Sequence, residues 1–251
     1  MSVEIRIDKV SKSFGEVVAV QNASFDIEPN RFVSIIGPSG CGKSTLMRIV
    51  SGLMPPDAGK VHIGGHSVSG PAPDVGMVFQ APVLLPWRSC LENVLLMGEM
   101  RGDKPGRHRA RAEELLELAG LAGFEDSYPH QLSGGMQQRV GICRALLLNP
   151  ALILMDEPFG ALDIISREKM GFELLKIWAH SRNTVLFVTH SITEAVLLSD
   201  TVVVMSARPG CIQDIIEIDL PRPRTRETMS EPRFAELSDT LRGQIQSQWS
   251  E

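Results

Sequence analysis

Residues 37–45 read Gly37-Pro38-Ser39-Gly40-Cys41-Gly42-Lys43-Ser44-Thr45. This stretch satisfies the pattern G-x-x-x-x-G-K-[ST], and it lies between an apolar run, 32–36, and a helix-like run, 46–50. The glycines allow backbone N–H groups to turn towards phosphate oxygens, and the start of the following helix adds partial positive charge. Lys43 is expected to reach the β and γ phosphates of a nucleotide and Ser44 to ligate Mg²⁺.

Short, nearly continuous apolar runs suit strands that are buried on both faces of a parallel sheet, although such a run alone does not exclude a buried helix. These runs are 32–36, 75–79, 152–155, 185–188 and 202–205. Helical stripes at 112–119 and 170–178 fill intervals between them, and strands that alternate with helices indicate an α/β fold. Ahead of these runs, alternation of apolar and polar residues at 3–7 and 23–27 predicts an antiparallel sheet with one wet face.

The 251 residues are expected to form one domain, 1–251, built from several parts. Residues 1–80 and 151–220 should form an α/β nucleotide-binding core with an antiparallel β-subdomain. Residues 81–150 hold no convincing strand and should form a helical insert. Residues 221–251 begin with a Pro- and Arg-rich segment and should form a surface extension that ends in a short helix.

Composition limits the classes of partner. The formal net charge of −5 provides no basic excess, which argues against nucleic acid as a partner. The four cysteines lie far apart and form no C-x-x-C pair, which suits a reducing cytosol. No apolar stretch approaches the roughly 20 residues that cross a bilayer, so any membrane role must come from a partner.

Two strands end in polar side chains that suit hydrolysis. The run 152–155 is followed by Asp156 and Glu157 at the carboxyl edge of the sheet, where open α/β folds bind ligands. Because neighbouring residues of a strand face opposite ways, Asp156 is expected in the Mg²⁺ shell and Glu157 beside the attacking water as general base. His190 follows the run 185–188; a lone histidine there is more often structural, but it is also a candidate for the γ-phosphate contact.

A second glycine-rich string, Leu132-Ser133-Gly134-Gly135-Met136-Gln137-Gln138-Arg139, lies just upstream of the acidic strand. Ser133 is a good helix N-cap, and the glycines leave N–H groups open to an anion. The string resembles the signature sequence of ABC ATPases, and the resemblance covers nearly the whole chain. It implies a P-loop NTPase (RecA-like) core and a homodimer in which the signature of one copy faces the phosphate-binding loop of the other around two ATP molecules.

The resemblance also implies roles for individual residues. Phe14 matches the aromatic that stacks on adenine, Gln80 the glutamine that touches Mg²⁺ and senses the permease, and Asp163 the aspartate that communicates across the dimer. His190 matches the switch histidine. The expected catalytic set is Lys43, Gln80, Glu157 and His190; the metal set is Ser44, Gln80 and Asp156; and the ATP-binding set is Phe14, Gly37 to Thr45, Ser133, Gly134, Gly135, Gln137 and Asp163.

Four strings resemble the branch of the family that energises import of nitrate, sulfonates and taurine. They are 85–88, 128–131, 157–160 and 206–210. The partners implied are a second copy of the chain, transmembrane permease subunits and, indirectly, a periplasmic or extracellular solute-binding protein. The implied location is the cytoplasmic face of the bacterial inner membrane. The sequence does not identify the solute or prove import over export.

Some alternatives stay open. Cys41 is either a reactive thiol at a helix start or, the favoured interpretation, a small residue tolerated in the loop. Residues 84–87 are either a permease contact or core of the insert. An ABC ATPase of the DNA-repair type would need a long coiled coil, whereas this chain has only a short helical insert without sustained heptads. Translation-factor relatives usually carry two ATPase halves in one chain, whereas this chain has one phosphate-binding motif and one signature string. A small-molecule P-loop kinase would have no use for the signature string.

Overall fold

The computed structural model describes residues 2–72, 74–181 and 183–246. The strands are β1 Ile5–Phe14, β2 Val17–Ile27, β3 Phe32–Ile36, β4 Ala58–Ile63, β5 His66–Ser67, β6 Val75–Val78, β7 Leu152–Asp156, β8 Thr184–Val188, β9 Thr201–Met205 and β10 Ile212–Glu217. The α-helices are α1 Lys43–Val50, α2 Cys90–Met100, α3 Arg109–Leu118, α4 Gly134–Leu146, α5 Ile164–Ser181, α6 Ile192–Leu198 and α7 Pro232–Gln246. Two short 3₁₀ helices are η1 Pro129–Gln131 and η2 Glu227–Ser230.

A six-stranded sheet with the order β10-β9-β3-β8-β7-β6 forms the centre of the molecule. Strands β9, β3, β8, β7 and β6 are parallel, and β10 pairs antiparallel with β9. The prediction of an α/β fold is therefore confirmed. Because the carboxyl ends of parallel strands meet at one edge, β3, β7 and β8 bring the glycine-rich loop 37–42, the acidic pair Asp156 and Glu157, and His190 together.

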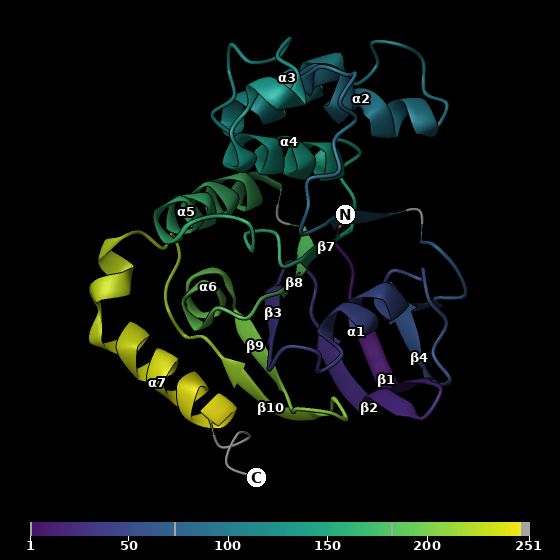
Figure 1. Ribbon diagram of the computed structural model, residues 1–251, viewed down its shortest axis with the longest axis vertical. Coiled ribbons are helices and arrows are strands. Elements are labelled where there is room, and N and C mark those ends of the chain that lie inside the picture. The colour runs from purple at the N-terminus through teal and green to yellow at the C-terminus, as the bar shows by residue number, and fades with distance from the viewer. Residues whose placement is uncertain (1, 73, 182, 247–251) are drawn as a thin grey trace.

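The strands of the central sheet are buried on both faces, and alternate side chains enter different cores. In β3, Phe32 and Ile36 pack with the helices α2 to α7, whereas Val33 and Ile35 pack with α1 and the antiparallel sheet. Figure 1 shows α1 with β1, β2 and β4 on one side of the central strands and α5, α6 and α7 on the other. This two-sided burial explains why these strands are continuous apolar runs in the sequence.

The N-terminal sheet has the order β2-β1-β4-β5 and is antiparallel. Ile5 pairs with Ile27 and Ile7 with Phe25, and all four are buried. The alternation of apolar and polar residues predicted this pair of strands. β4 and β5 were not predicted, since in β4 only one residue is fully buried and no regular alternation marks the strand.

Helices fill the interval between β6 and β7, where the structure, which describes all of residues 81–150, contains no strand. α2 begins with a capping box in which Ser89 and Glu92 each bond the other's backbone N–H. α2, α3 and α4 pack on one another and form the top layer in Figure 1, above α5. The glycine-rich string at 133–135 starts α4 and so lies in this layer.

The C-terminal segment is more firmly attached than expected. α7 has 15 residues, and Phe234, Leu237 and Leu241 on it are buried against the core that α6 also joins. Arg224 is 5% exposed, and its guanidinium donates to backbone carbonyls, among them that of Ser199 at 2.6 Å. The prediction of a surface extension with a short helix is therefore corrected.

Within the described ranges, no helix has both the length and the apolar character needed to cross a membrane.

Candidate functional site

The glycine-rich loop of residues 37–42 joins the end of β3 to the start of α1, and it is called the phosphate-binding loop after the role that the sequence predicts for it. Gly40 and Gly42 have φ angles of 75° and 100°, where L side chains are strained. At Gly42 a Cβ atom would also lie 2.4 Å from the carbonyl oxygen of Ala19 on β2. The glycines therefore let the loop curl against the antiparallel sheet and leave its N–H groups and the start of α1 available to an anion.

Lys43 is held inside this loop. Its Nζ donates to the carbonyl oxygens of Gly37 and Pro38, each at 2.9 Å, and the residue is 5% exposed. A buried ammonium group needs such partners, and they fix a positive charge at the loop. The sulfur of Cys41 lies 3.7 Å from the same Nζ, and Cys41 is 1% exposed. That burial agrees with the interpretation of Cys41 as a small packed residue.

Ser44 and Asp156 meet at the carboxyl edge of the sheet. The Ser44 Oγ donates to the Asp156 Oδ1 at 2.9 Å, although the residues are far apart in the chain. Burial raises the pKa of Asp156 above its ordinary value, while the hydrogen bond from Ser44 opposes this shift. A hydroxyl and a carboxylate beside a phosphate-binding loop are the hard oxygen donors that Mg²⁺ uses together with substrate phosphates, so this pair fits the metal.

Gln80 lies two residues beyond β6 and is exposed. A Cβ atom at Gly160 would lie 3.0 Å from the Gln80 Nε2, so the glutamine lies against the turn that follows β7. In the described part of the chain Gln80 forms no hydrogen bond with Ser44 or Asp156. The structure therefore brings Gln80 near the acidic strand end without joining it to the other two predicted metal ligands.

Glu157 and His190 form a second pair at the same edge. The Glu157 Oε2 lies 3.2 Å from the His190 Nδ1, and the two side chains are 26% and 49% exposed. Glu157 has a φ angle of 45°, so the chain turns sharply after Asp156. The two neighbouring acids consequently have different partners, Ser44 for Asp156 and His190 for Glu157. This arrangement leaves Glu157 open to a water molecule.

A buried polar cluster lies next to His190. The Thr189 hydroxyl donates to the carboxylate of Glu194, which is 8% exposed and whose pKa is raised, chiefly by burial. The Arg167 Nε lies 3.5 Å from the other carboxylate oxygen, and its Nη2 donates to the carbonyl oxygen of Leu162 at 3.2 Å. The cluster links the backbone that carries His190 to the turn that precedes α5.

Asp163 begins that turn and lies on the surface. Its Oδ1 accepts from the backbone N–H groups of Ser166 at 3.0 Å and Ile165 at 3.1 Å. Hydrogen bonds from Ser166 have the largest effect on the pKa of Asp163, and together with the bond from Ile165 they lower it below its ordinary value. Ile164 and Ile165 beside it are 83% and 77% exposed. The structure thus places Asp163 outside the pocket that holds Lys43, next to an exposed apolar pair.

A pocket of about 320 Å³ connects the phosphate-binding loop with Glu157. It is lined by Phe14, Val17, Ala19, Ser39, Gly40, Gly42, Lys43, Ser44, Thr45, Glu157 and Arg208. Phe14 is 48% exposed and lines it from the end of β1. Val17, Ala19 and Arg208 were not predicted as site residues. Arg208 lies in the string 206–210, which carries no spacing that signals a phosphate contact.

The glycine-rich string at the start of α4 contributes nothing to this pocket. Ser133 caps α4 by accepting from the Met136 N–H at 3.3 Å, and Ser133 and Gly134 are exposed. The Gln137 amide donates to two backbone carbonyls, including that of Pro129 at 2.9 Å, so it stabilises the preceding loop. Figure 1 places α4 in the helical layer and α1 beside the antiparallel sheet. One copy of the chain therefore keeps the two glycine-rich motifs apart.

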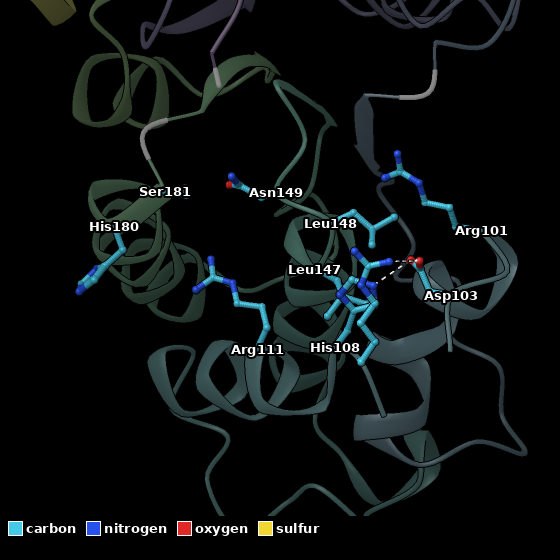
Figure 2. A pocket seen from close by; sticks show the side chains of 10 residues that line it. Arg101, Asp103, His108, Arg111, Leu147, Leu148, Asn149, His180 and Ser181 are labelled. Carbon is cyan, nitrogen blue, oxygen red and sulfur yellow. Dashed lines mark hydrogen bonds and ion pairs between the residues drawn. The ribbon is translucent and has the colours of Figure 1, made fainter. Parts of the chain in front are cut away.

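A second cavity, of about 630 Å³, lies between the helical layer and the end of α5. Figure 2 shows Arg101, His108 and Arg111 around it, with Asp103 bonded to neighbouring side chains. Asp103 pairs with Arg107 at 2.7 Å and His108 at 2.8 Å, and Arg111 pairs with Glu114. Although this cavity is larger, its charges are mostly paired and it holds none of the predicted site residues. The smaller pocket is the candidate site, because the glycine-rich loop 37–42, Lys43 and the carboxylate of Glu157 converge there.

Comparison with known proteins agrees with this geometry. Residues 20–160 match the family model described as ABC transporter. A taurine import ATP-binding protein of Rhizobium johnstonii is 43% identical over 253 residues, which cover 97% of each chain. An aliphatic sulfonates import ATP-binding protein of Bacillus cereus is 43% identical over 245 residues, covering 95% of this chain and 96% of that protein.

Solved structures are similar as well. One is the dimeric structure of an ATP-binding cassette in a post-hydrolysis state, bound to ADP and Pi. It is 35% identical, covers 86% of this chain and 100% of its own, and superposes with a TM-score of 0.73.

Proposed function

The chain belongs to the ABC transporter family, and we propose that it is the ATP-hydrolysing subunit of an importer that moves a small anion through a separate permease. Like the family, it binds and hydrolyses ATP. The observation that carries the proposal is the meeting of Lys43, Ser44, Asp156 and Glu157 at one edge of the parallel sheet.

We assign the chemical steps to the residues of this pocket. Phe14 would stack on adenine, and Lys43 with the loop N–H groups would bind the phosphates. Mg²⁺, held by Ser44 and Asp156 with Gln80 nearby, would neutralise phosphate charge. Glu157 would polarise the attacking water, and His190, 3.2 Å from it, would orient that water and the γ-phosphate.

The complete site requires a second copy of the chain. The exposed N–H groups at the start of α4 form an anion-binding surface that one copy cannot bring to its own pocket. We propose that Ser133, Gly134 and Gly135 of the second copy close the pocket over ATP, as in a two-fold sandwich. Asp163, with the exposed Ile164 and Ile165, would lie at the same interface.

We propose the partners and the solute class by analogy with the relatives. The names of the similar proteins refer to taurine and aliphatic sulfonates, so we propose a sulfonate or a related small anion such as nitrate as the solute. A periplasmic or extracellular solute-binding protein would deliver it. The chain would lie against the cytoplasmic face of the membrane, bound to its permease.

Residues 84–87 are the proposed contact with the permease, and Val83 lies next to them. Trp87 is 70% exposed and Val83 60% exposed, whereas Leu84 packs against the core. Arg144 donates to the carbonyl oxygens of Pro82 and Val83, both at 2.9 Å, which fixes this segment to α4. An exposed tryptophan close to a segment that is held in this way is the kind of anchor that fills a pocket in a partner. The helical layer would transmit motion from the nucleotide to the permease.

Trp87→Ala should separate ATP hydrolysis from transport. We expect solute uptake in membrane vesicles that contain the permease to fall about tenfold or more, because aromatic anchors commonly contribute about 2 kcal/mol or more to an interface. ATP hydrolysis by the isolated chain should stay unchanged. The matched control is Met100→Ala, also on the insert and 73% exposed, which should leave uptake intact. Normal uptake by Trp87→Ala would rule out this contact, and absence of any permease-stimulated ATP hydrolysis would rule out the transport role.

A further inference from the structure

The turn between β9 and β10, residues 206–211, is fastened to the phosphate-binding loop and to β2. Gly210 donates to the Ala19 carbonyl oxygen at 3.2 Å and accepts from the Gln21 N–H at 2.9 Å. A Cβ atom at Gly210 would lie 1.9 Å from the carbonyl oxygen of Cys41, so the backbones of the two loops touch. The Ser206 hydroxyl donates to the Pro209 carbonyl oxygen at 2.8 Å and accepts from the Cys211 N–H at 2.8 Å. The turn is thus a fixed wall of the pocket.

Arg208 projects from this wall onto the phosphate-binding loop. Its Nε donates to the Gly40 carbonyl oxygen at 2.9 Å, and a Cβ atom at Gly40 would lie 3.1 Å from its Nη2. Arg208 also lines the pocket that contains Phe14 and Lys43. Within the described residues, no carboxylate pairs with its guanidinium. The N–H groups on its two terminal nitrogens are therefore available to a ligand.

The charges of the pocket favour a polyanion at this position. Lys43 is buried and its Nζ is held by two loop carbonyls, whereas Arg208 is exposed at the rim. The carboxylate that lines the pocket is that of Glu157, which faces His190. A guanidinium presents several donors in a planar fork that matches phosphate oxygens.

We infer that Arg208 binds the polyphosphate chain of the nucleotide as a second cation beside Lys43, and that the turn 206–211 positions the Arg208 guanidinium at the phosphate-binding loop. This inference rests on the proposed nucleotide site. The hydrogen bond to Gly40 fixes the guanidinium, so it loses little freedom when ATP binds. Arg208 is then a nucleotide-contacting residue supplied by a segment remote in sequence from the loop.

Arg208→Gln tests the inference, because the glutamine amide can still donate to Gly40 while the charge is lost. We expect the Kd for ATP to rise about tenfold, the value for ADP to rise less, and the value for AMP to change least. Arg208→Lys should recover part of the ATP affinity. The melting temperature without nucleotide should stay the same. Isothermal titration calorimetry with ATP, ADP and AMP measures these affinities.

Arg101→Gln is the matched control, since Arg101 is exposed and lies at the other cavity. It should bind all three nucleotides like the unmodified chain. Equal affinity for ATP in Arg208→Gln and in the unmodified chain would overturn the inference. So would an equal loss for ATP, ADP and AMP, which would mean that Arg208 only supports the loop. If the unmodified chain bound no ATP, or if Lys43→Ala left binding unchanged, the proposed nucleotide site itself would fail.

Discussion

Glu157→Gln should slow ATP hydrolysis by about 10²–10⁴-fold, the range in which a general base contributes. Glutamine has nearly the same shape and can still lie beside His190, but its amide cannot accept the proton of the attacking water. Nucleotide binding should persist, since Lys43 and the loop N–H groups are untouched. Single-turnover release of phosphate measures the loss.

The same substitution should convert the ATP-bound chain into a stable dimer. Because the sandwich closes around ATP and opens after hydrolysis, a chain that binds but does not hydrolyse ATP should accumulate in the closed state. Gel filtration with ATP and Mg²⁺ detects it. Glu113→Gln on the surface of α3 is the matched control and should hydrolyse ATP normally without forming a trapped dimer. A monomeric Glu157→Gln chain under these conditions would contradict the sandwich.

Gly135→Asp should remove most ATP hydrolysis without harming the fold. A Cβ atom at Gly135 would meet only the Leu162 Cδ2, at an ordinary 3.8 Å, and a carboxylate in the first turn of α4 favours the helix through its dipole. The same charge would repel the γ-phosphate of the nucleotide bound to the other copy. We expect a loss of roughly 100-fold, comparable with removing a donor that stabilises an oxyanion.

Gly135→Ala separates charge from bulk. It adds the Cβ atom without the carboxylate and should keep much more activity than Gly135→Asp. Thermal melting should show that both variants fold like the unmodified chain. Full hydrolysis by Gly135→Asp would show that the start of α4 is not part of the reaction centre.

The sequence predicted the parallel strands of the central sheet, because strands buried on both faces form short apolar runs, and the helical stripes between these runs favoured strands over buried helices. It also predicted that the ends of β3, β7 and β8 would bring Ser44, Asp156, Glu157 and His190 together, since parallel strands share a carboxyl edge. The chemical roles of these residues stay predictions. The α/β fold class and the ABC family are confirmed by the structure and by the comparisons.

What the sequence did not reveal depends on contacts between distant segments. Arg208 reaches Gly40 because β9 lies beside β3, a pairing that no local pattern encodes. In β10 half-buried residues alternate with exposed ones and none is fully buried, so the strand carries a weak signal in the sequence. α7 was underestimated because its three buried residues are separated by polar ones and are covered only after the chain returns to α6.

Each reaction centre should combine the phosphate-binding loop of one copy with the start of α4 of another, and mixing two inactive variants shows whether it does. Lys43→Ala and Gly135→Asp should each be nearly inactive alone. In an equimolar mixture, random pairing makes half of the dimers mixed, each with one intact centre, so roughly a quarter of the normal ATP hydrolysis should return. A chain that carries both substitutions should restore nothing when mixed with either variant. If the mixture showed only the average of the two separate activities, each reaction centre would lie within one copy and not between two.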